Sequence, residues 1–292
     1  MNGFLCVLKP PGMTSSDVVV RVRRKLGGKT KVGHAGTLDP EAAGVLPLMI
    51  GKASRLFDYL VDKEKTYVAQ LIPGYSTDTQ DAHGQIVSGE GRGVSLEELE
   101  AALPRFVGEI KQIPPAFSAL KRDGQKLCDL ARQGVRLEVE PRPTRVDEIR
   151  VMHALEDGSY LIRVRCGRGT YIRTLCHDIG EALGCGAHMG FLLRTQTGMF
   201  TLSDAHTIEE IDAETDLSGL LTAIDRPLGH LPDVTVAPEA ERFVRNGNEL
   251  RPAQLDPVPP QGVSVRLYVG GRFAGIGRMR GEGMKFDAML LE

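Results

Sequence analysis

The sequence predicts an α+β domain followed by a smaller domain that contains only β-strands. Up to about residue 230, segments with the two-residue period of strands alternate with segments that have helical spacing. The composition then changes around residues 226–238, and short apolar runs separated by glycine and proline follow. A chain of 292 residues is long enough for one large and one small domain. We therefore expect domains at residues 1–230 and 231–292.

The first domain is expected to begin with a strand and a capped helix. Residues 4–10, FLCVLKP, have the pattern of a short buried strand that ends at a Pro-Pro-Gly sequence. Thr14 and the two serines after it are suitable caps for a helix that begins near Asp17. The glycine pair at 27–28 then ends that helix.

The remaining elements follow from periodicity and capping signals. Residues 44–74 are expected to form a strand, a short helix and a second strand from Lys65. In this second strand three side chains share one face: Tyr67, Ala69 and Leu71. Further elements are expected as helices over 96–106 (capped by Ser95), 125–134 and 171–184, and as a strand over 159–167. In the second domain the expected strands are VTV, GVSVRLYVGG, RFAGIGRM and KFDAMLL.

Charge is segregated along the chain, although the net charge is only −2. Residues 21–31 carry six positive charges and residues 161–174 carry four arginines, and neither segment contains an acid. Residues 204–216 carry six acids and no lysine or arginine. This segregation allows a basic face on a nearly neutral protein, but solvated helix faces would give the same pattern.

Composition also limits the location of the protein. No apolar run approaches the ~20 residues that a membrane-spanning helix needs. The short apolar run at the N-terminus has no basic leader before it, which favours a strand over a signal peptide. Five cysteines, an odd number scattered over a long chain, are typical of reduced thiols. We therefore expect a cytoplasmic protein.

Two common kinds of site find little support. The sequence GGKT at residues 27–30 resembles the end of a phosphate-binding loop, but that loop requires a glycine where Arg23 stands. Cys176, His177, Cys185 and His188 do not have the spacing of a usual zinc site. Asp39 remains, because it lies among small residues that would let another molecule approach closely. Spacing alone favours a turn residue before Pro40 over a functional role for Asp39.

Longer motifs around Asp39 carry a resemblance to a known family. Residues 33–47, GHAGTLDPEAAGVLP, resemble the catalytic motif of the TruB family of tRNA pseudouridine synthases. Further similar stretches occur in the family's order: KPPGMTSSD, KTYVAQLIPGYSTDTQDAHG, IPPAFSALKRDGQKLCDLARQG and GRGTYIRTLCHDIGEALGCGAHMGFLLRTQTGMF. The resemblance covers roughly residues 3–230, and several independent motifs are more specific than any single one.

The resemblance implies a fold, a reaction and a partner. It implies a large, mostly antiparallel sheet with helices around it and a cleft across it, followed by a C-terminal PUA-like domain at residues 231–292 that contacts the acceptor stem or acts only as a stabilising cap. The reaction would be isomerisation of uridine 55 in the T loop of tRNA to pseudouridine, with the base flipped out of the stack. The resemblance implies no cofactor and no metal. It also implies that the T stem-loop of tRNA is the partner, and that the protein is a monomer with no obligate protein partner.

Six residues match the family's site positions. Asp39 would act as nucleophile or as base, and the sequence leaves open whether it attacks uracil C6, attacks ribose C1′ or removes a proton. Arg173, beside Tyr171, would form an ion pair with Asp39 and so orient its carboxylate. Tyr67 would stack on the uracil and assist proton transfer.

The other two matching residues are expected to act by packing. Leu192 would line the uracil pocket, and His34 would hold the displaced stack open by packing rather than as a general base. Where the family often has two arginines after this leucine, the chain has Leu193 and Arg194. We therefore expect Arg194 alone to supply the basic contact.

The charged segments and the rival functions complete the expectations. Residues 21–31 would contact RNA phosphates, and residues 204–216 would face away from the RNA. Asp78 and Asp81 in the TDTQD sequence are expected to be structural. Two rival functions remain open: an RNA chaperone with the same fold but no catalysis, and an unrelated small-molecule hydrolase that uses Asp39.

Overall fold

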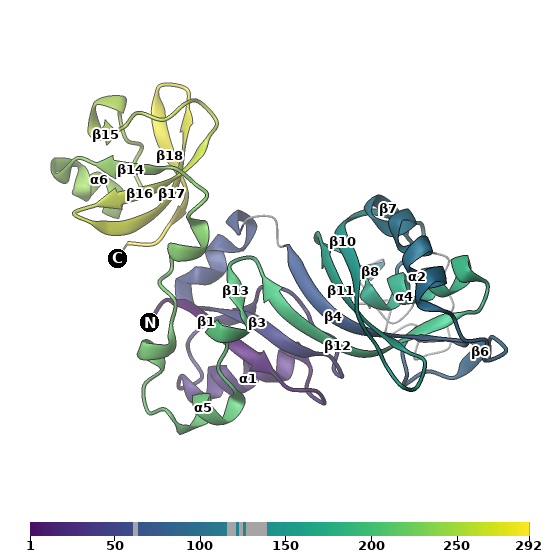
Figure 1. The fold of residues 1–292 in the computed structure, drawn as a ribbon. Helices are drawn as coiled ribbons and strands as arrows, with labels where there is room; N and C mark the ends of the chain where they lie inside the picture. The colour runs from purple at the N-terminus through teal and green to yellow at the C-terminus, as the bar shows by residue number, and fades with distance from the viewer. Residues whose placement is uncertain (61–63, 116–120, 123–124, 127–138, 292) are drawn as a thin grey trace.

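The computed structural model describes residues 1–60, 64–115, 121–122, 125–126 and 139–291 (Figure 1). A nine-stranded sheet forms the larger part of the molecule. Its main path runs in the order β1 (Gly3–Lys9), β3 (Ala43–Ile50), β12 (Ala187–Thr197), β4 (Lys65–Pro73), β11 (Tyr160–Cys166), β10 (Arg142–Ala154) and β7 (Gly108–Gln112). Off this path, β2 (Val32–His34) pairs with β3, and β13 (Phe200–Thr201) pairs with β12.

The pairing confirms the expected α+β fold with a mostly antiparallel sheet. Among the strand pairs of this sheet within the described residues, only β12 and β3 run parallel. Around the sheet lie α1 (Ser15–Lys25), α2 (Leu96–Ala102), α4 (Ile172–Leu183) and α5 (Ile208–Ala213), with the 3₁₀ helices η1 (Gly51–Tyr59), η2 (Leu103–Phe106), η3 (Leu202–Asp204), η4 (Leu217–Leu220) and η5 (Arg226–Leu228). Short ladders join β5 (Ser76–Thr77) to β6 (Ile86–Ser88) and β8 (Lys121–Arg122) to β9 (Gln125–Lys126).

Local capping explains where the main helices begin and end. Thr14 caps α1, and its hydroxyl and the Asp17 carboxylate satisfy each other's backbone N–H groups. Helix α4 ends at Gly184, whose φ of 68° lies in the left-handed region that glycine adopts readily. Both boundaries agree with the sequence expectation. Buried side chains of α1 and α4 belong to one apolar cluster with the faces of the sheet strands.

The sequence pattern identified many elements but not all. The strands over 4–10 and 159–167, the strand–helix–strand segment over 44–74 and the helices over 96–106 and 171–184 are confirmed. The strands β7, β10 and β12 were not anticipated. The helix expected over 125–134 lies mostly outside the described residues, and its first two residues form β9.

The C-terminal part forms a separate five-stranded sheet (Figure 1). Its order is β15 (Leu255–Asp256), β14 (Asp233–Val236), β16 (Ser264–Val269), β17 (Arg272–Arg280) and β18 (Gly283–Met289). The short helices η6 (Pro238–Ala240), α6 (Glu241–Arg245) and η7 (Pro252–Gln254) accompany it. The four expected strands are present, while the expected domain boundary at residue 230 stays a prediction.

Part of the acidic segment meets part of the basic one, because α5 lies beside α1 (Figure 1). The expectation that residues 204–216 face away from the RNA stays a prediction. Arg21 forms an ion pair with Asp212, and Lys25 Nζ donates to the Asp212 carbonyl oxygen at 2.6 Å. Opposite charges attract when the fold permits contact, so part of the 21–31 charge is neutralised within the protein.

None of the described helices is both long and apolar enough to cross a lipid bilayer.

Candidate active site

A cleft of about 350 Å³ opens across the large sheet. Its walls come from the segment between β2 and β3, from β4 and β12, and from the turn that leads from β11 into α4. All six residues expected from the sequence line this cleft: His34, Asp39, Tyr67, Tyr171, Arg173 and Leu192. Segments more than 130 residues apart in sequence are therefore brought to one site by the sheet order.

Asp39 and Arg173 form the central ion pair. Arg173 Nε lies 2.9 Å from Asp39 Oδ2. The arginine side chain is 6% exposed, whereas that of Asp39 is 42% exposed. The buried guanidinium therefore holds the carboxylate from behind and leaves its other side open to a ligand, as a charge-assisted hydrogen bond can do.

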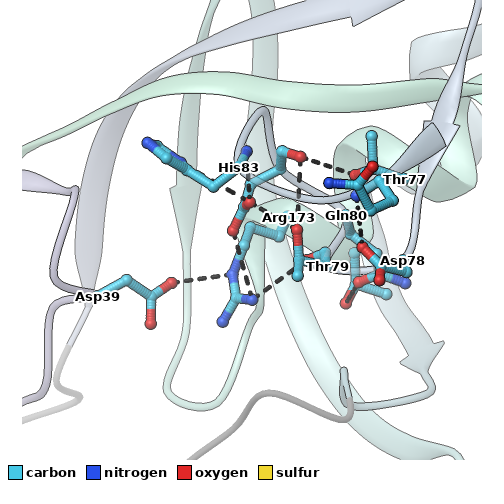
Figure 2. Close-up of polar contacts among 10 residues, drawn as sticks. Asp39, Thr77, Asp78, Thr79, Gln80, His83 and Arg173 are labelled. Atoms are coloured by element: carbon cyan, nitrogen blue, oxygen red, sulfur yellow. Dashed lines mark hydrogen bonds and ion pairs between the residues drawn. The ribbon is translucent and has the colours of Figure 1, made fainter. Parts of the chain in front are cut away.

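Arg173 is itself fixed by the loop over residues 77–83, as Figure 2 shows. Its NH1 group donates to the Thr79 carbonyl oxygen at 3.2 Å and lies 3.7 Å from Asp81 Oδ2. Asp81 Oδ1 accepts from the Thr79 hydroxyl at 2.7 Å and from the His83 backbone N–H at 3.0 Å. Asp81 thus braces both its own loop and Arg173, in addition to the structural role expected for it.

Gln112 is a supporting residue that the sequence reasoning missed. This side chain, 2% exposed, donates to the Tyr171 carbonyl oxygen at 3.1 Å and accepts from the Tyr171 N–H at 3.0 Å. Gln112 therefore binds both backbone polar groups of Tyr171, the residue that precedes α4. A strand residue 59 positions earlier gives no sequence signal for such a contact.

Tyr67 forms a buried wall of the cleft and is 6% exposed. Burial raises the pKa of Tyr67 to about 12, although the positive charge of Arg194 opposes that shift. The phenol therefore keeps its proton at neutral pH. This state suits stacking and proton donation better than the role of a base.

His34 and Leu192 supply the steric part of the site. Burial, and secondarily the charge of Arg194, lower the pKa of His34 below its usual value. The imidazole is therefore neutral at pH 7, as its expected packing role requires. Leu192 is 7% exposed and adds an apolar surface to the cleft.

Lys9 holds the loop that carries Asp39 from one side. This residue is 0% exposed, and its Nζ donates to the carbonyl oxygens of Pro10, Pro40 and Ala42 at 2.7, 2.8 and 2.7 Å. Burial lowers the pKa of Lys9 to about 8. The sequence signal was a lysine at the end of an otherwise buried strand, and its function was not recognised.

Arg194, which was expected to supply the basic contact of its segment, lies in the interior. Its side chain is 0% exposed, so it cannot reach a phosphate on the surface. Instead its guanidinium donates to the carbonyl oxygens of Val45, Thr37 and Gly36 at 2.7, 3.1 and 3.1 Å. The loop that carries Asp39 is therefore held between two buried cations.

The described residues contain no group of three or more histidine, cysteine or acidic side chains that could hold a metal ion.

Solved structures with this architecture define the class of the protein. The chain resembles a protein in the "Structure of H/ACA RNP bound to a substrate RNA containing 2'-deoxyuridine", with a TM-score of 0.73 and 25% identity over 99% of this chain and 85% of that one. It also resembles a chain of the "Crystal Structure of a Cbf5-Nop10-Gar1 Complex", with a TM-score of 0.72 and 28% identity over 97% and 83% of the two chains. The fold is that of the pseudouridine synthases.

Sequence comparison identifies the family within this class. The family models "TruB family pseudouridylate synthase (N terminal domain)", "tRNA pseudouridylate synthase B C-terminal domain" and "Pseudouridine synthase II TruB, C-terminal" match residues 23–172, 173–228 and 232–284. Proteins called tRNA pseudouridine synthase B are similar over nearly the whole chain. That of Alkaliphilus oremlandii is 45% identical over 97% of this chain and 94% of its own length, and that of Clostridium novyi is 39% identical over the full length of both. The chain belongs to the TruB family.

Proposed function

We propose that this protein isomerises uridine 55 in the T loop of tRNA to pseudouridine, and that Asp39 is the catalytic aspartate. The relatives' names supply the reaction and the substrate class. The observation that carries the proposal is the accessible Asp39 carboxylate, held by a buried Arg173 in a cleft between Tyr67 and Leu192.

The geometry suits the chemistry of the isomerisation. The N1–C1′ bond of uridine breaks, the base turns, and a C5–C1′ bond forms while the C5 proton is lost and N1 gains one. One bond to C1′ replaces another, and one proton is lost while another is gained. The reaction therefore needs a group that adds to the nucleoside or moves its protons, and the Asp39 carboxylate can do either. Attack on uracil C6, attack on ribose C1′ and proton abstraction all remain consistent with the carboxylate position.

The uridine must leave its stack before it reaches Asp39. This step costs a few kcal/mol, which contacts with the protein must offset. An aromatic wall at Tyr67 and an apolar one at Leu192 provide surfaces for the flipped base. His34, which lines the same cleft, is proposed to hold the displaced stack open by packing.

Tritium release from tRNA labelled at uridine C5 tests the proposal. We expect the wild-type protein to release tritium, and Asp39→Asn to lose this activity while still binding tRNA. The matched control is Glu41→Gln, which removes an exposed carboxylate two positions away. Full activity of Asp39→Asn would contradict the role of Asp39.

Filter binding across a range of salt concentrations separates the rival functions. An RNA-binding protein shows an affinity that falls steeply with salt, whereas a small-molecule hydrolase does not bind RNA. A catalytically idle chaperone would bind tRNA without releasing tritium. We further propose that the protein acts in the cytoplasm. We also propose that it is a monomer without an obligate protein partner, which gel filtration of the active protein checks.

A further inference from the structure

Arg194 is a fully buried cation that does not line the cleft but bonds to two residues that do, Gly36 and Thr37. In the large sheet it pairs with Gly44 of β3 on one side and with Tyr67 of β4 on the other. The strand that carries it therefore separates the two halves of the site, with the segment of Asp39 on one side and the aromatic wall on the other.

The guanidinium forms hydrogen bonds with the main chain before and after Asp39. Its three nitrogens donate to the carbonyl oxygens of Gly36, Thr37 and Val45, at 3.1, 3.1 and 2.7 Å. A guanidinium has donors in a fixed planar fork, so three such bonds define its orientation relative to the loop.

The same residue also lies beside Tyr67. Arg194 of β12 and Tyr67 of β4 are register partners in the large sheet. The positive charge of Arg194 opposes the rise in the pKa of Tyr67. One residue thus connects the loop of Asp39 to the strand whose tyrosine forms the wall on which a base would stack.

Packing alone does not explain a charge at this place. Taking a cation out of water costs several kcal/mol unless other groups compensate. Among the described residues, the hydrogen bonds of Arg194 to the loop all go to carbonyl oxygens rather than to a carboxylate. An apolar side chain of similar volume could fill the space, but it would leave these carbonyl groups unpaired and the loop unanchored.

We propose that Arg194 is a positioning residue, which fixes the Asp39 carboxylate relative to the Tyr67 ring before RNA enters the cleft. The inference rests on the proposed function, because the position of these two groups matters only if both act on the same nucleoside. Displacement of a reacting group by about 1 Å can reduce a rate about 100-fold without loss of binding.

Two substitutions test the proposal. Arg194→Met removes the charge and the fork, while Arg194→Lys keeps the charge but replaces the fork by a single ammonium group. The matched control is Leu71→Ala, a 1% exposed residue of β4 that belongs to the same apolar cluster as Tyr67. For each protein the single-turnover rate of tritium release, the Kd for tRNA and the Tm are measured, with rates taken well below the Tm.

We expect the control to lower the Tm and to leave the single-turnover rate within about threefold of wild type. Both Arg194 variants should bind tRNA as wild type does, with the rate about 100-fold lower in Arg194→Met and intermediate in Arg194→Lys. Rates near wild type in a folded Arg194→Met protein would overturn the proposal. So would equal loss of rate in Leu71→Ala, or failure of both Arg194 variants to fold, because Arg194 would then act through stability alone. An inactive wild-type protein would instead refute the proposed function itself.

Discussion

At the scale of single residues, the two members of the Asp39–Arg173 ion pair differ in exposure. The arginine is buried and braced by the Thr79 carbonyl group and Asp81, while the aspartate is open to the cleft. Such an arrangement keeps the carboxylate in one orientation without covering it. A substrate can therefore meet a pre-oriented acid, and little reorganisation is needed when it binds.

The fork of Arg173 should be as important as its charge. Different nitrogens contact Asp39 and the Thr79 carbonyl oxygen, and a lysine cannot make both contacts. We expect Arg173→Lys to reduce the single-turnover rate of tritium release about 100-fold, because Asp39 loses its orientation. The Kd for tRNA should change little, and unchanged turnover would show that charge alone suffices.

The hydroxyl group of Tyr67 should not titrate in the physiological range. Because burial raises its pKa to about 12, the phenol keeps its proton at every pH below that value. Tyr67→Phe should therefore give a rate profile parallel to that of wild type between about pH 6 and 9, whatever its absolute rate. An alkaline limb that is present in wild type and missing in the variant would contradict this expectation.

At the scale of elements, the segment between β2 and β3 is anchored at its end by Gly44. Its φ is 116°, and a Cβ atom there would lie 2.1 Å from the Arg194 carbonyl oxygen. The close approach follows from the pairing of β3 with both β1 and β12, where Lys9 and Arg194 lie opposite Gly44. A Cβ atom at this position would overlap the main chain of β12, so the pairing of β3 with β12 here requires a residue without a side chain.

Substitution of this glycine should therefore cost more than backbone strain. Gly158→Ala is the control, because its φ of 80° is also left-handed but no atom lies within 4 Å of the added carbon. We expect the control to lose about 1–2 kcal/mol of unfolding free energy. Gly44→Ala should lose a further ~1–3 kcal/mol from overlap with β12. Urea unfolding measures both, and equal losses would rule out the steric argument.

Elements with a regular pattern could be predicted from the sequence, and those shaped by their neighbours could not. β11 alternates buried and partly exposed residues along its whole length. β12 is interrupted by two register shifts against β4 and carries an arginine at a core position, so its two-residue period is broken. β10 is mostly exposed or partly buried and also contains shifts, which hides it from a search for apolar periodicity.

In the site too, some residues could be recognised from the sequence and others could not. Asp39 stood out by its small neighbours, but its pairing with Arg173 depends on contacts 134 positions apart and came only from family resemblance. Lys9, Gln112 and Arg194 act through hydrogen bonds to main-chain groups, and these leave no mark in a sequence. The sequence therefore predicted a basic contact by Arg194 but not its burial, because most arginines lie at the surface.

At the scale of the whole molecule, the larger part and the C-terminal part share an apolar contact. Leu56 and Leu228 of the larger part pack in one cluster with Ile276, Ala288 and Leu290 of the C-terminal part. Polar contacts accompany it, including a 2.7 Å bond from the Tyr268 hydroxyl to Asp225 and a 2.9 Å bond from Arg55 to the Met289 carbonyl oxygen. The C-terminal sheet is thus held against the larger part and is not merely tethered to it.

This contact predicts joint unfolding of the two parts. Wild type should show a single calorimetric transition, whereas Leu228→Ala, which loses about 2–5 kcal/mol at the contact, should show two. The control Leu48→Ala, inside the large sheet and 0% exposed, should lower the Tm but keep one transition. Two transitions in wild type would mean that the contact does not couple the two parts.

Anchoring by peptide carbonyl oxygens has a consequence for sequence change. Every amino acid brings the same carbonyl group, so Lys9 and Arg194 can hold the backbone at positions 37, 40 and 42 without depending on the side chains there. Variation or engineering could therefore alter what those side chains recognise while Asp39 stays where it is.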